Sequence, residues 1–381
     1  MSTFHVQLER VVHDSYQIKI GRNLFDTLIA DLKGPFFHPI AKFAVISDSN
    51  ISQLYGEPLV RKLKESGFDC DLFAIPSGEK SKTRETKAFV EDQMLAKGYG
   101  RDSCIIALGG GMISDLSGFI ASTFCRGIPY LNYSTTLLSA ADASVGGKTA
   151  VNTPMATNLI GTFYQPSKVY IDLETWKSLP LREFRSGLAE TIKHACMADY
   201  EFFEYLEQNM TRIITSDQLI LESDVCEHIA YKNCEIKYRV VEKDERESNL
   251  RQILNLGHTA GRAIEALSQY QLLHGEAVAI GLAIQSKLAY KLGFITKEEF
   301  YRVCRLLRNA GFEIDVPSYI TADSLIKKMY TDKKVRNGKI RFVFMSGIGK
   351  VKQFEDVSYS TPIEETILYE TVNEIITTSY H

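Results

Sequence analysis

The stretch Cys104-Ile-Ile-Ala-Leu-Gly-Gly-Gly-Met-Ile-Ser-Asp115 has the form of a buried strand, a glycine turn and the start of a helix. Glycines allow the backbone to approach a diphosphate, and a helix N-terminus offers unpaired N–H donors and a partial positive charge. The spacing is Gly-Gly-Gly-x-x-x-Asp, so the usual Gly-x-Gly-x-x-Gly fingerprint is not met. We expect a nucleotide site here, and a tight turn without a ligand is the alternative.

Around this turn, the first 180 residues alternate short apolar strands with helical stretches. That alternation is typical of a parallel sheet with helices on its faces. The expected strands are 42–48, 70–75, 104–108, 129–133 and 168–171, and two of the helices between them are 54–66 and 82–97. The opening segment 3–20 resembles an antiparallel pair of strands added at one edge.

The second half has a different periodicity. From Leu181 onward strand signals nearly vanish, and stretches with a period of about 3.6 residues predict helices. The best of these are 202–209, 218–241, 259–267, 276–292 and 297–310, and the apolar run 340–344 is either a strand or a buried extended segment. We therefore predict an α/β N-terminal Rossmann-like domain over 1–180 and a mostly α-helical C-terminal domain over 181–381.

Composition excludes several classes of function. A chain of 381 residues with 45% hydrophobic and 24% charged residues is long enough for two domains with a substantial core. The net charge of −3 gives no reason to expect nucleic acid or a membrane as partner, and no apolar run approaches the roughly 20 residues of a membrane span. The seven cysteines never form Cys-x-x-Cys, and the start lacks a signal-type apolar block. We expect reduced thiols and a cytoplasmic protein.

Two more polar loops come after predicted strands. Asp48-Ser-Asn50 follows one strand, and Ser77-Gly-Glu-Lys-Ser-Lys82 follows the next. Each alone can be an ordinary turn or helix cap. Together with the glycine turn they indicate a shared crevice at the carboxyl edge of the sheet, where nucleotides bind in such folds.

A further stretch indicates an anionic substrate. Asp142-Ala-Ser-Val-Gly-Gly-Lys148 follows Thr135-Thr136 and resembles part of a phosphate-binding loop, although it lacks the first glycine and the spacing of a Walker motif. The cationic or amide groups that we expect around an anion are Lys148, Asn158, Lys193, Lys237, Arg251 and Arg262. For each of them, an ordinary surface position is the alternative.

Three dispersed residues form a candidate metal site: Glu190, His258 and His274. One carboxylate and two imidazoles are an open ligand set for a divalent ion such as zinc, with room for a substrate oxygen. The alternatives are an ion pair between Glu190 and Lys193, three residues apart on a predicted helix, and capping or core roles for the histidines.

The spacing of the two histidines allows them to meet. A helix from His258 to about Ser268 is roughly 16 Å long. The five residues 269–273 span at most about 17 Å when extended. The chain can therefore just return, which brings both imidazoles to the same end of two neighbouring helices.

These segments together resemble the dehydroquinate synthase family, within the wider group of sugar phosphate cyclases. The resemblance runs from Asp48 to Gly349 and is most specific at 109–115, Arg126-Gly-Ile, 135–152, Asn158-Leu-Ile-Gly, 187–193, 251–265 and 273–278. It implies an NAD-binding α/β domain before a mostly helical metal-binding domain, an active site between the two, and a homodimer. The implied cofactors are NAD and a divalent metal, zinc or cobalt.

The site positions of the family can each be matched to a residue of this sequence. The metal ligands match Glu190, His258 and His274. Positions that line NAD or the nearby substrate match Asp48, Asn50, Gly78, Glu79, Lys82, Gly110, Gly111, Met112, Asp115, Thr135, Thr136 and Lys148. The substrate pocket matches Lys193, Lys237, Arg251, Asn255, Lys333 and Lys334, and we add Asp142, Asn158 and Arg262 from the same stretches. Arg126 resembles an arginine that reaches the substrate phosphate from the partner subunit.

The resemblance implies a shikimate-route enzyme that converts 3-deoxy-D-arabino-heptulosonate 7-phosphate, a phosphorylated sugar acid, into 3-dehydroquinate. In that reaction a substrate hydroxyl is oxidised transiently by NAD, phosphate leaves by β-elimination, and the ketone is reduced again. Ring opening and an intramolecular aldol closure then form the carbocycle. Metal, lysines and arginines serve to polarise the oxygen and to hold the anionic groups.

Two departures bear on the substrate. Members that make dehydroquinate usually read Gly-His-Thr-Phe-Gly-His, whereas Arg262 replaces the second histidine here, and Thr157-Asn158 stands where Lys-Asn is commoner. An arginine can still bind an anion in a planar two-point contact, but it cannot act as a neutral proton acceptor. Arg251 and Asn255 keep the dehydroquinate-type pattern.

Three alternatives remain open. The first is a cyclase that acts on sedoheptulose 7-phosphate or glucose 6-phosphate, whose substrates carry no carboxylate. The second is a metal-dependent alcohol dehydrogenase of the glycerol dehydrogenase type, which would release NADH. The third is a catalytically silent binding protein on the same scaffold, against which the intact ligand triad argues.

Overall fold

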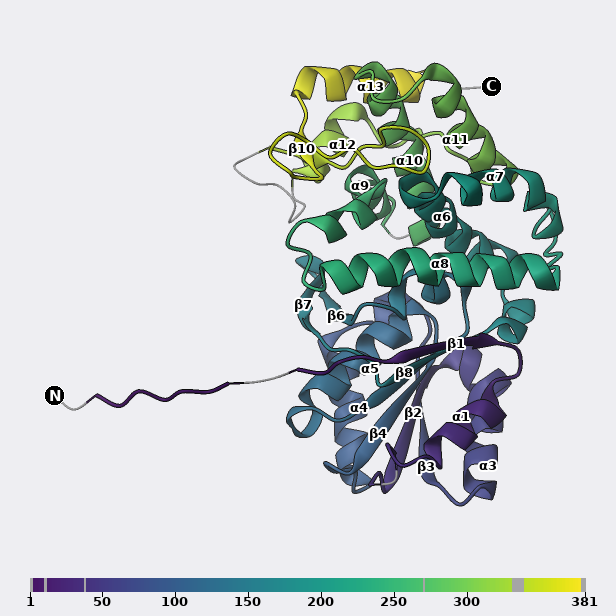
Figure 1. Ribbon diagram of the computed structural model, residues 1–381, viewed down its shortest axis with the longest axis vertical. Coiled ribbons are helices and arrows are strands. Elements are labelled where there is room, and N and C mark those ends of the chain that lie inside the picture. The colour runs from purple at the N-terminus through teal and green to yellow at the C-terminus, as the bar shows by residue number, and fades with distance from the viewer. Residues whose placement is uncertain (1–2, 10–11, 38, 270, 331–338, 378–381) are drawn as a thin grey trace.

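The computed structural model describes residues 3–9, 12–37, 39–269, 271–330 and 339–377. Figure 1 shows a sheet with its helices at one end of the molecule and a helical half at the other, with the long helix α8 (Ser223–Lys243) lying across the junction. The last strand of the sheet ends at Asp172 and the first long helix of the other half begins at Leu181, on either side of the predicted boundary.

In the described residues, six strands form one parallel sheet in the order β1-β8-β5-β4-β2-β3. The strands are β1 (Gln17–Gly21), β2 (Lys42–Asp48), β3 (Asp69–Ile75), β4 (Ser103–Gly109), β5 (Tyr130–Ser134) and β8 (Lys168–Asp172). The five predicted strands are confirmed within a residue or two. The central strand β4 is buried throughout, because helices cover both faces of a parallel sheet.

The helices of this half divide between the two faces. A core with residues from α4 (Arg84–Ala96) and α5 (Gly111–Thr123) lies on one face, and a core with residues from α1 (Phe25–Leu32) and α3 (Glu57–Glu65) lies on the other. All seven cysteines lie in described residues and none is disulfide-bonded, as the sequence predicted.

The prediction for segment 3–20 was wrong. β1 joins the sheet edge parallel to β8, and the described residues 3–9 and 12–16 contain no strand. Alternation of apolar residues does not determine strand direction, which depends here on the turn after β1. The carboxylate of Asp172 accepts hydrogen bonds from the backbone N–H groups of Asn23 and Leu24, at 2.9 and 3.0 Å, so the chain turns there into α1.

A β-hairpin that was not predicted from the sequence lies beside α5. Its strands are β6 (Lys148–Thr153) and β7 (Ala156–Phe163), paired antiparallel. The hairpin packs closely on α5, where a Cβ at Gly118 would meet the side chains of Thr149 and Tyr130. It matters for function because it carries Lys148 and Asn158 toward the helical half.

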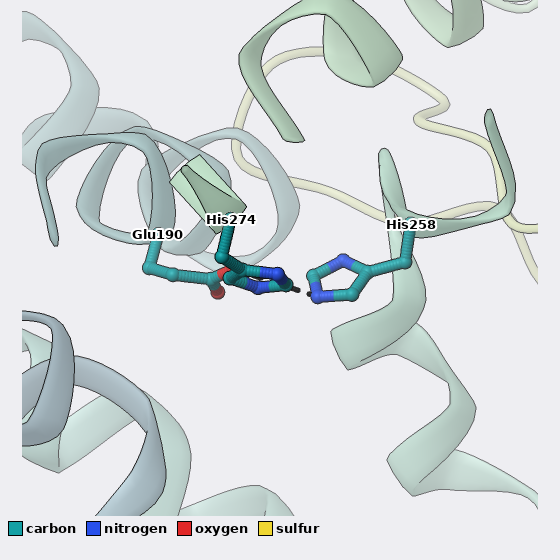
Figure 2. A group of neighbouring side chains, drawn as sticks. All are labelled: Glu190, His258 and His274. Atoms are coloured by element: carbon teal, nitrogen blue, oxygen red, sulfur yellow. Dashed lines mark hydrogen bonds and ion pairs between the residues drawn. The ribbon is translucent and has the colours of Figure 1, made fainter. Parts of the chain in front are cut away.

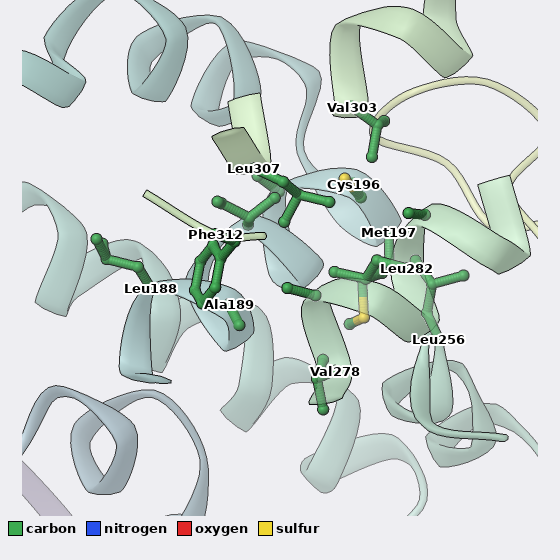
Figure 3. Close-up of a cluster of buried hydrophobic side chains, with 14 of the residues drawn as sticks. Leu188, Ala189, Cys196, Met197, Leu256, Val278, Leu282, Val303, Leu307 and Phe312 are labelled. Carbon is green, nitrogen blue, oxygen red and sulfur yellow. The ribbon is translucent and has the colours of Figure 1, made fainter. Parts of the chain in front are cut away.

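The helices of the helical half pack around one large hydrophobic core. Its helices include α6 (Leu181–Ala198), α7 (Tyr200–Asn209), α9 (His258–Leu267), α10 (His274–Lys291), α11 (Lys297–Asn309), α12 (Ala322–Met329) and α13 (Glu365–Thr377). Figure 3 shows part of this core, where Leu188 of α6, Leu282 of α10 and Leu307 of α11 are among the packed side chains. The predicted helices are confirmed, with ends shifted by a few residues.

The late apolar run 340–344 is mainly a buried extended segment. Only β9 (Arg341–Phe342) pairs as a strand, with β10 (Thr361–Pro362). Within the residues that the structure describes, no helix combines the length and the apolar composition that a membrane span requires.

Glycines bring the backbones of three helices into contact. A Cβ at Gly281 of α10 would collide with the carbonyl oxygen of Gly257 and lie 2.7 Å from the amide nitrogen of Gly261. A Cβ at Gly275 of α10 would collide with the backbone of Ser186 in α6. Because of these approaches, α6, α9 and α10 lie closer together than ordinary side chains allow.

We expect Gly281→Ala to destabilise the protein by about 1–3 kcal/mol, because the added methyl overpacks the crossing of α9 and α10. Denaturant unfolding of the full chain measures this loss. Gly100→Ala is the control, since its Cβ would lie 3.2 Å from Asp102 Oδ1, the end of a side chain that can rotate away. Equal stability of the two variants would contradict the role of Gly281.

Candidate active site

Three side chains converge where α6, α9 and α10 meet (Figure 2). Glu190 lies in the middle of α6, and His258 and His274 are the first residues of α9 and α10. Oε1 of Glu190 lies 3.2 Å from Nε2 of His274 and 3.4 Å from Nε2 of His258, and one ligand atom from each residue lies within 4.8 Å of the others. The fold thus brings together the three residues that the sequence singled out.

The outward-facing atoms of these side chains are held by neighbours. Oε2 of Glu190 accepts from Nζ of Lys193, so the ion pair considered from sequence exists but uses only one carboxylate oxygen. Nδ1 of His258 lies 3.1 Å from the carbonyl oxygen of Leu256. A carbonyl can only accept, so Nδ1 carries the proton and the lone pair of Nε2 points inward.

Burial and charge set the protonation of the cluster. Burial lowers the pKa of His258, and the positive charge of Lys193 lowers it further. Burial also opposes the charged form of His274, but Glu265 and Glu190 outweigh it and raise that pKa to about 10. For Glu190, burial is outweighed by Lys193, which keeps the carboxylate pKa below its ordinary value. One oxygen and two imidazole nitrogens fit zinc or cobalt in kind and number.

A cleft of about 520 Å³ lies beside this cluster, between the sheet and the helical half. Its lining includes every group that we expected around an anionic substrate: Lys148, Asn158, Lys193, Lys237, Arg251 and Arg262. His258 also lines the cleft, together with Asp115, Asp142 and Asn255. The cationic groups therefore share one space with His258, one of the three candidate metal ligands.

Several of these cations are paired within the protein. Nζ of Lys237 donates to Oδ1 of Asp142 at 2.6 Å. Burial raises the pKa of Asp142, but Lys237 outweighs burial and holds that pKa well below its usual range. Arg251 is almost fully buried and donates to the carbonyl oxygens of Gly146 and Glu245, which ties the helical half to the loop before β6.

Glu247 is a site residue that the sequence did not reveal. Its carboxylate accepts from Nζ of Lys148 in the hairpin and, at 2.7 Å, from Nδ2 of Asn255. Its backbone φ of 60° lies in the left-handed region, which is uncommon for a residue other than glycine and cannot be predicted from the sequence here. An anionic ligand that needs Lys148 and Asn255 has to displace this carboxylate.

The predicted nucleotide residues lie at one edge of the sheet. They stand at the carboxyl ends of β5, β4, β2 and β3, which are adjacent strands in the sheet order, or in the turns and first helical turns that follow them: Asp48, Asn50, Gly78, Glu79, Lys82, Gly110, Gly111, Met112, Asp115, Thr135 and Thr136. Nζ of Lys82 is buried between Oε1 of Glu79 at 2.8 Å and Oδ2 of Asp115 at 3.0 Å. Asp48 caps the short helix α2 (Ser49–Ile51), so the Asx-cap alternative is also realised.

Two observations suit a dinucleotide at this edge. α5 begins after Gly110 without a side-chain cap, which leaves its first N–H groups to a ligand or solvent. The hydroxyl oxygen of Thr135 is buried and has no hydrogen-bond partner in the described part of the chain. These residues fit the NAD that the family resemblance implies.

Arg126 does not line the cleft of its own chain. It is exposed just beyond the far end of α5, in a turn where Cys125 and Arg126 have φ values of 49° and 70°. The predicted substrate residues Lys333 and Lys334 lie outside the described residues.

Solved structures with the same fold show the class of protein. The fold is that of sugar phosphate cyclases: the solved structure of 2-epi-5-epi-valiolone synthase from Streptomyces hygroscopicus, with NAD+ and Zn2+ bound, matches with a TM-score of 0.85 at 26% identity. That match covers 98% of this chain and 99% of the other. A 2-deoxy-scyllo-inosose synthase shares the fold with a TM-score of 0.84 at 24% identity, covering 94% and 96%.

Sequence comparison is more specific. Family models described as 3-dehydroquinate synthase N-terminal and C-terminal match residues 72–186 and 187–335. A 3-dehydroquinate synthase of Thermodesulfovibrio yellowstonii is 47% identical over 89% of this chain and 92% of its own length, and one from Rippkaea orientalis is 41% identical over 96% and 98%. The chain belongs to the 3-dehydroquinate synthase family, whose members are carbon–oxygen lyases.

We expect metal binding at neutral pH to release about one proton, from His274. At pH 7 this imidazole is protonated, because its pKa is about 10, and it must lose the proton to coordinate. His258 is already neutral and Glu190 already ionised, so neither contributes. The apparent affinity for Co2+ should therefore rise about tenfold per pH unit between pH 7 and 9.

Calorimetry of Co2+ binding in buffers of different ionisation enthalpy measures the proton count. His274→Ala serves as the control and should abolish the release together with most of the affinity. Binding without proton release, or affinity that does not change with pH, would contradict this assignment.

Proposed function

We propose that this chain converts 3-deoxy-D-arabino-heptulosonate 7-phosphate into 3-dehydroquinate and phosphate, with NAD and one zinc or cobalt ion as cofactors. One observation carries the proposal: the cluster of Glu190, His258 and His274 lies beside a cleft lined by seven cationic side chains. A substrate with a phosphate at one end and a carboxylate at the other needs cations on both sides of its reacting carbon atoms.

In the proposed assignment, Glu190, His258 and His274 hold the metal ion, and the loops after β2 to β5 hold NAD. When bound, these cofactors polarise one substrate oxygen and provide a transient hydride acceptor. The substrate hydroxyl becomes a ketone, which acidifies the adjacent C–H bond, and phosphate leaves by β-elimination. Reduction of the ketone, ring opening and aldol closure complete the sequence.

The residues of the chain position this substrate. Lys148, Lys237 and Arg262 present charge into the cleft, and Lys193 holds the outer oxygen of Glu190. Because the substrate exchanges places with carboxylates such as Glu247, anions are favoured over neutral sugars of similar size. Arg262 offers a planar two-point contact to phosphate or carboxylate, in place of the second histidine of the usual family motif.

The choice among cyclases rests on Arg251 and Asn255. Both line the cleft. By the family resemblance, both also keep the pattern of the cyclases whose substrate carries a carboxylate. The identity of 41–47% to 3-dehydroquinate synthases, against 26% to the valiolone synthase, supports the same choice.

The test is a substrate comparison. Purified protein with NAD and Co2+ is offered the heptulosonate 7-phosphate, sedoheptulose 7-phosphate, glucose 6-phosphate and glycerol, while phosphate and NADH are followed. We expect phosphate release with the heptulosonate alone and no net NADH, because each hydride returns to the substrate. Turnover of sedoheptulose 7-phosphate instead would refute the proposed substrate, and NADH accumulation with glycerol would favour a dehydrogenase.

We propose further that the enzyme acts as a homodimer in which Arg126 serves the partner's cleft. Supporting this, Arg126 is exposed and does not line its own cleft, and its turn holds two successive non-glycine residues at positive φ. Such conformations cost about 1–3 kcal/mol each and tend to be kept where they present a functional group.

Subunit mixing tests this arrangement. Arg126→Ala and Glu190→Ala should each be nearly inactive, yet mixing the two after mild unfolding and refolding should restore activity. A mixed dimer then has one site with both an intact metal cluster and an intact arginine from the partner. If mixing restores nothing although mixed dimers form, Arg126 does not act across the interface.

A further inference from the structure

Glu265 is a charged residue to which the proposed reaction assigns no role. It lies near the end of α9, with its side chain 17% exposed, and Oε2 of its carboxylate lies 3.4 Å from Nδ1 of His274. Among the described residues, that imidazole is the only polar partner of the Glu265 carboxylate. The opposite nitrogen of the same ring, Nε2, lies 3.2 Å from Oε1 of Glu190.

The position of Glu265 on α9 accounts for this contact. It follows His258 by seven residues, which is two helical turns on the same face, about 10 Å along the axis. The ring of His274 begins the neighbouring helix, and the ring centroids of the two histidines are 5.3 Å apart. The imidazole of His274 therefore lies along α9, with Nε2 toward His258 and Nδ1 toward Glu265.

Two of the three cluster residues already have a group that fixes their orientation. Lys193 holds the outer oxygen of Glu190, and the carbonyl oxygen of Leu256 holds Nδ1 of His258. His274 is different, because it is the more exposed histidine, with 29% of its side chain accessible. A ring that is partly open to solvent can rotate, or can carry its proton on the wrong nitrogen.

We propose that Glu265 is a positioning residue for the metal site, whose carboxylate accepts the Nδ1–H of His274 and so directs the Nε2 lone pair at the ion. The inference rests on the proposed metal site. A carboxylate behind a histidine ligand fixes the tautomer and ring orientation and strengthens the ligand, and removal of such a partner costs about 10- to 100-fold in metal affinity.

The experiment measures Co2+ affinity by chelator competition, and the visible spectrum of the Co2+-loaded full-length protein, without any assay of turnover. With the affinity measured over a range of pH and corrected for the proton that His274 releases, we expect Glu265→Ala to weaken it about 10- to 100-fold and to alter the Co2+ bands, because the ring of His274 loses its fixed orientation. Glu265→Gln keeps the volume and an acceptor oxygen, so it should lose less and keep the spectrum closer to that of the parent protein. The glutamine variant also covers the case in which the alanine variant does not fold.

Glu276→Gln is the matched control. Glu276 lies two residues after His274, but its carboxylate caps α10 at the backbone N–H of Leu273 and pairs with Arg182. Its replacement should leave Co2+ affinity within about twofold of the parent, since Glu276 has no contact with the imidazole in the described structure.

His274→Ala separates the two proposals. If His274→Ala loses Co2+ while both Glu265 variants keep the parent affinity and spectrum, Glu265 has no positioning role and the metal site stands. If His274→Ala also keeps the parent affinity, the metal site itself is wrong.

Discussion

The close approach of three backbones, at Gly275 and Gly281 of α10, is the constraint on which this site depends. Side chains at these positions would collide with Ser186 of α6 and Gly257 before α9. With glycine there, the first residues of α9 and α10 come to the same place as the middle of α6. The large core around Leu188, Leu282 and Leu307 holds the helices in this arrangement, so the hydrophobic energy of the core positions a polar cluster (Figure 3).

Internal pairing explains how a protein with a net charge of −3 can present a cationic cleft. Lys193, Lys237 and Lys148 each face a carboxylate of the chain, from Glu190, Asp142 and Glu247 respectively. Burial makes an unpaired charge costly, so the carboxylates offset the charges of the buried Lys193 and Lys237 before a ligand arrives. Because the contacts of Lys148 with Glu247 and of Arg251 with Gly146 join the two halves, a ligand that displaced Glu247 would also alter the interface between them.

Local patterns predicted most of the fold, and long-range geometry limited the rest. The hydrophobic periodicity of the buried parallel strands and long amphipathic helices is a local property of the sequence, so their positions were predicted well. β1 was placed in the wrong pairing because alternation is the same for parallel and antiparallel strands. The hairpin 148–163 was missed because its two strands have weak alternation and, once folded, one of them is largely exposed.

In the candidate site, too, local patterns were predictable and long-range contacts were not. Glu190, His258 and His274 were predictable from their residue types and from the short return between two helices. Glu247 was not, because its role depends on a left-handed backbone conformation and on a partner about a hundred residues away. Glu265 was not singled out from the sequence, because only the packing of α9 on α10 brings its carboxylate to an imidazole.

In the proposed site, one divalent ion joins α6, α9 and α10. Anomalous diffraction at the cobalt edge, from crystals of the Co2+-loaded protein, would locate that ion. We expect one strong peak about 2.0–2.2 Å from Oε1 of Glu190 and from Nε2 of both His258 and His274, with Lys193 still on the other oxygen of Glu190. A peak on other side chains, or none while the protein binds cobalt in solution, would contradict it.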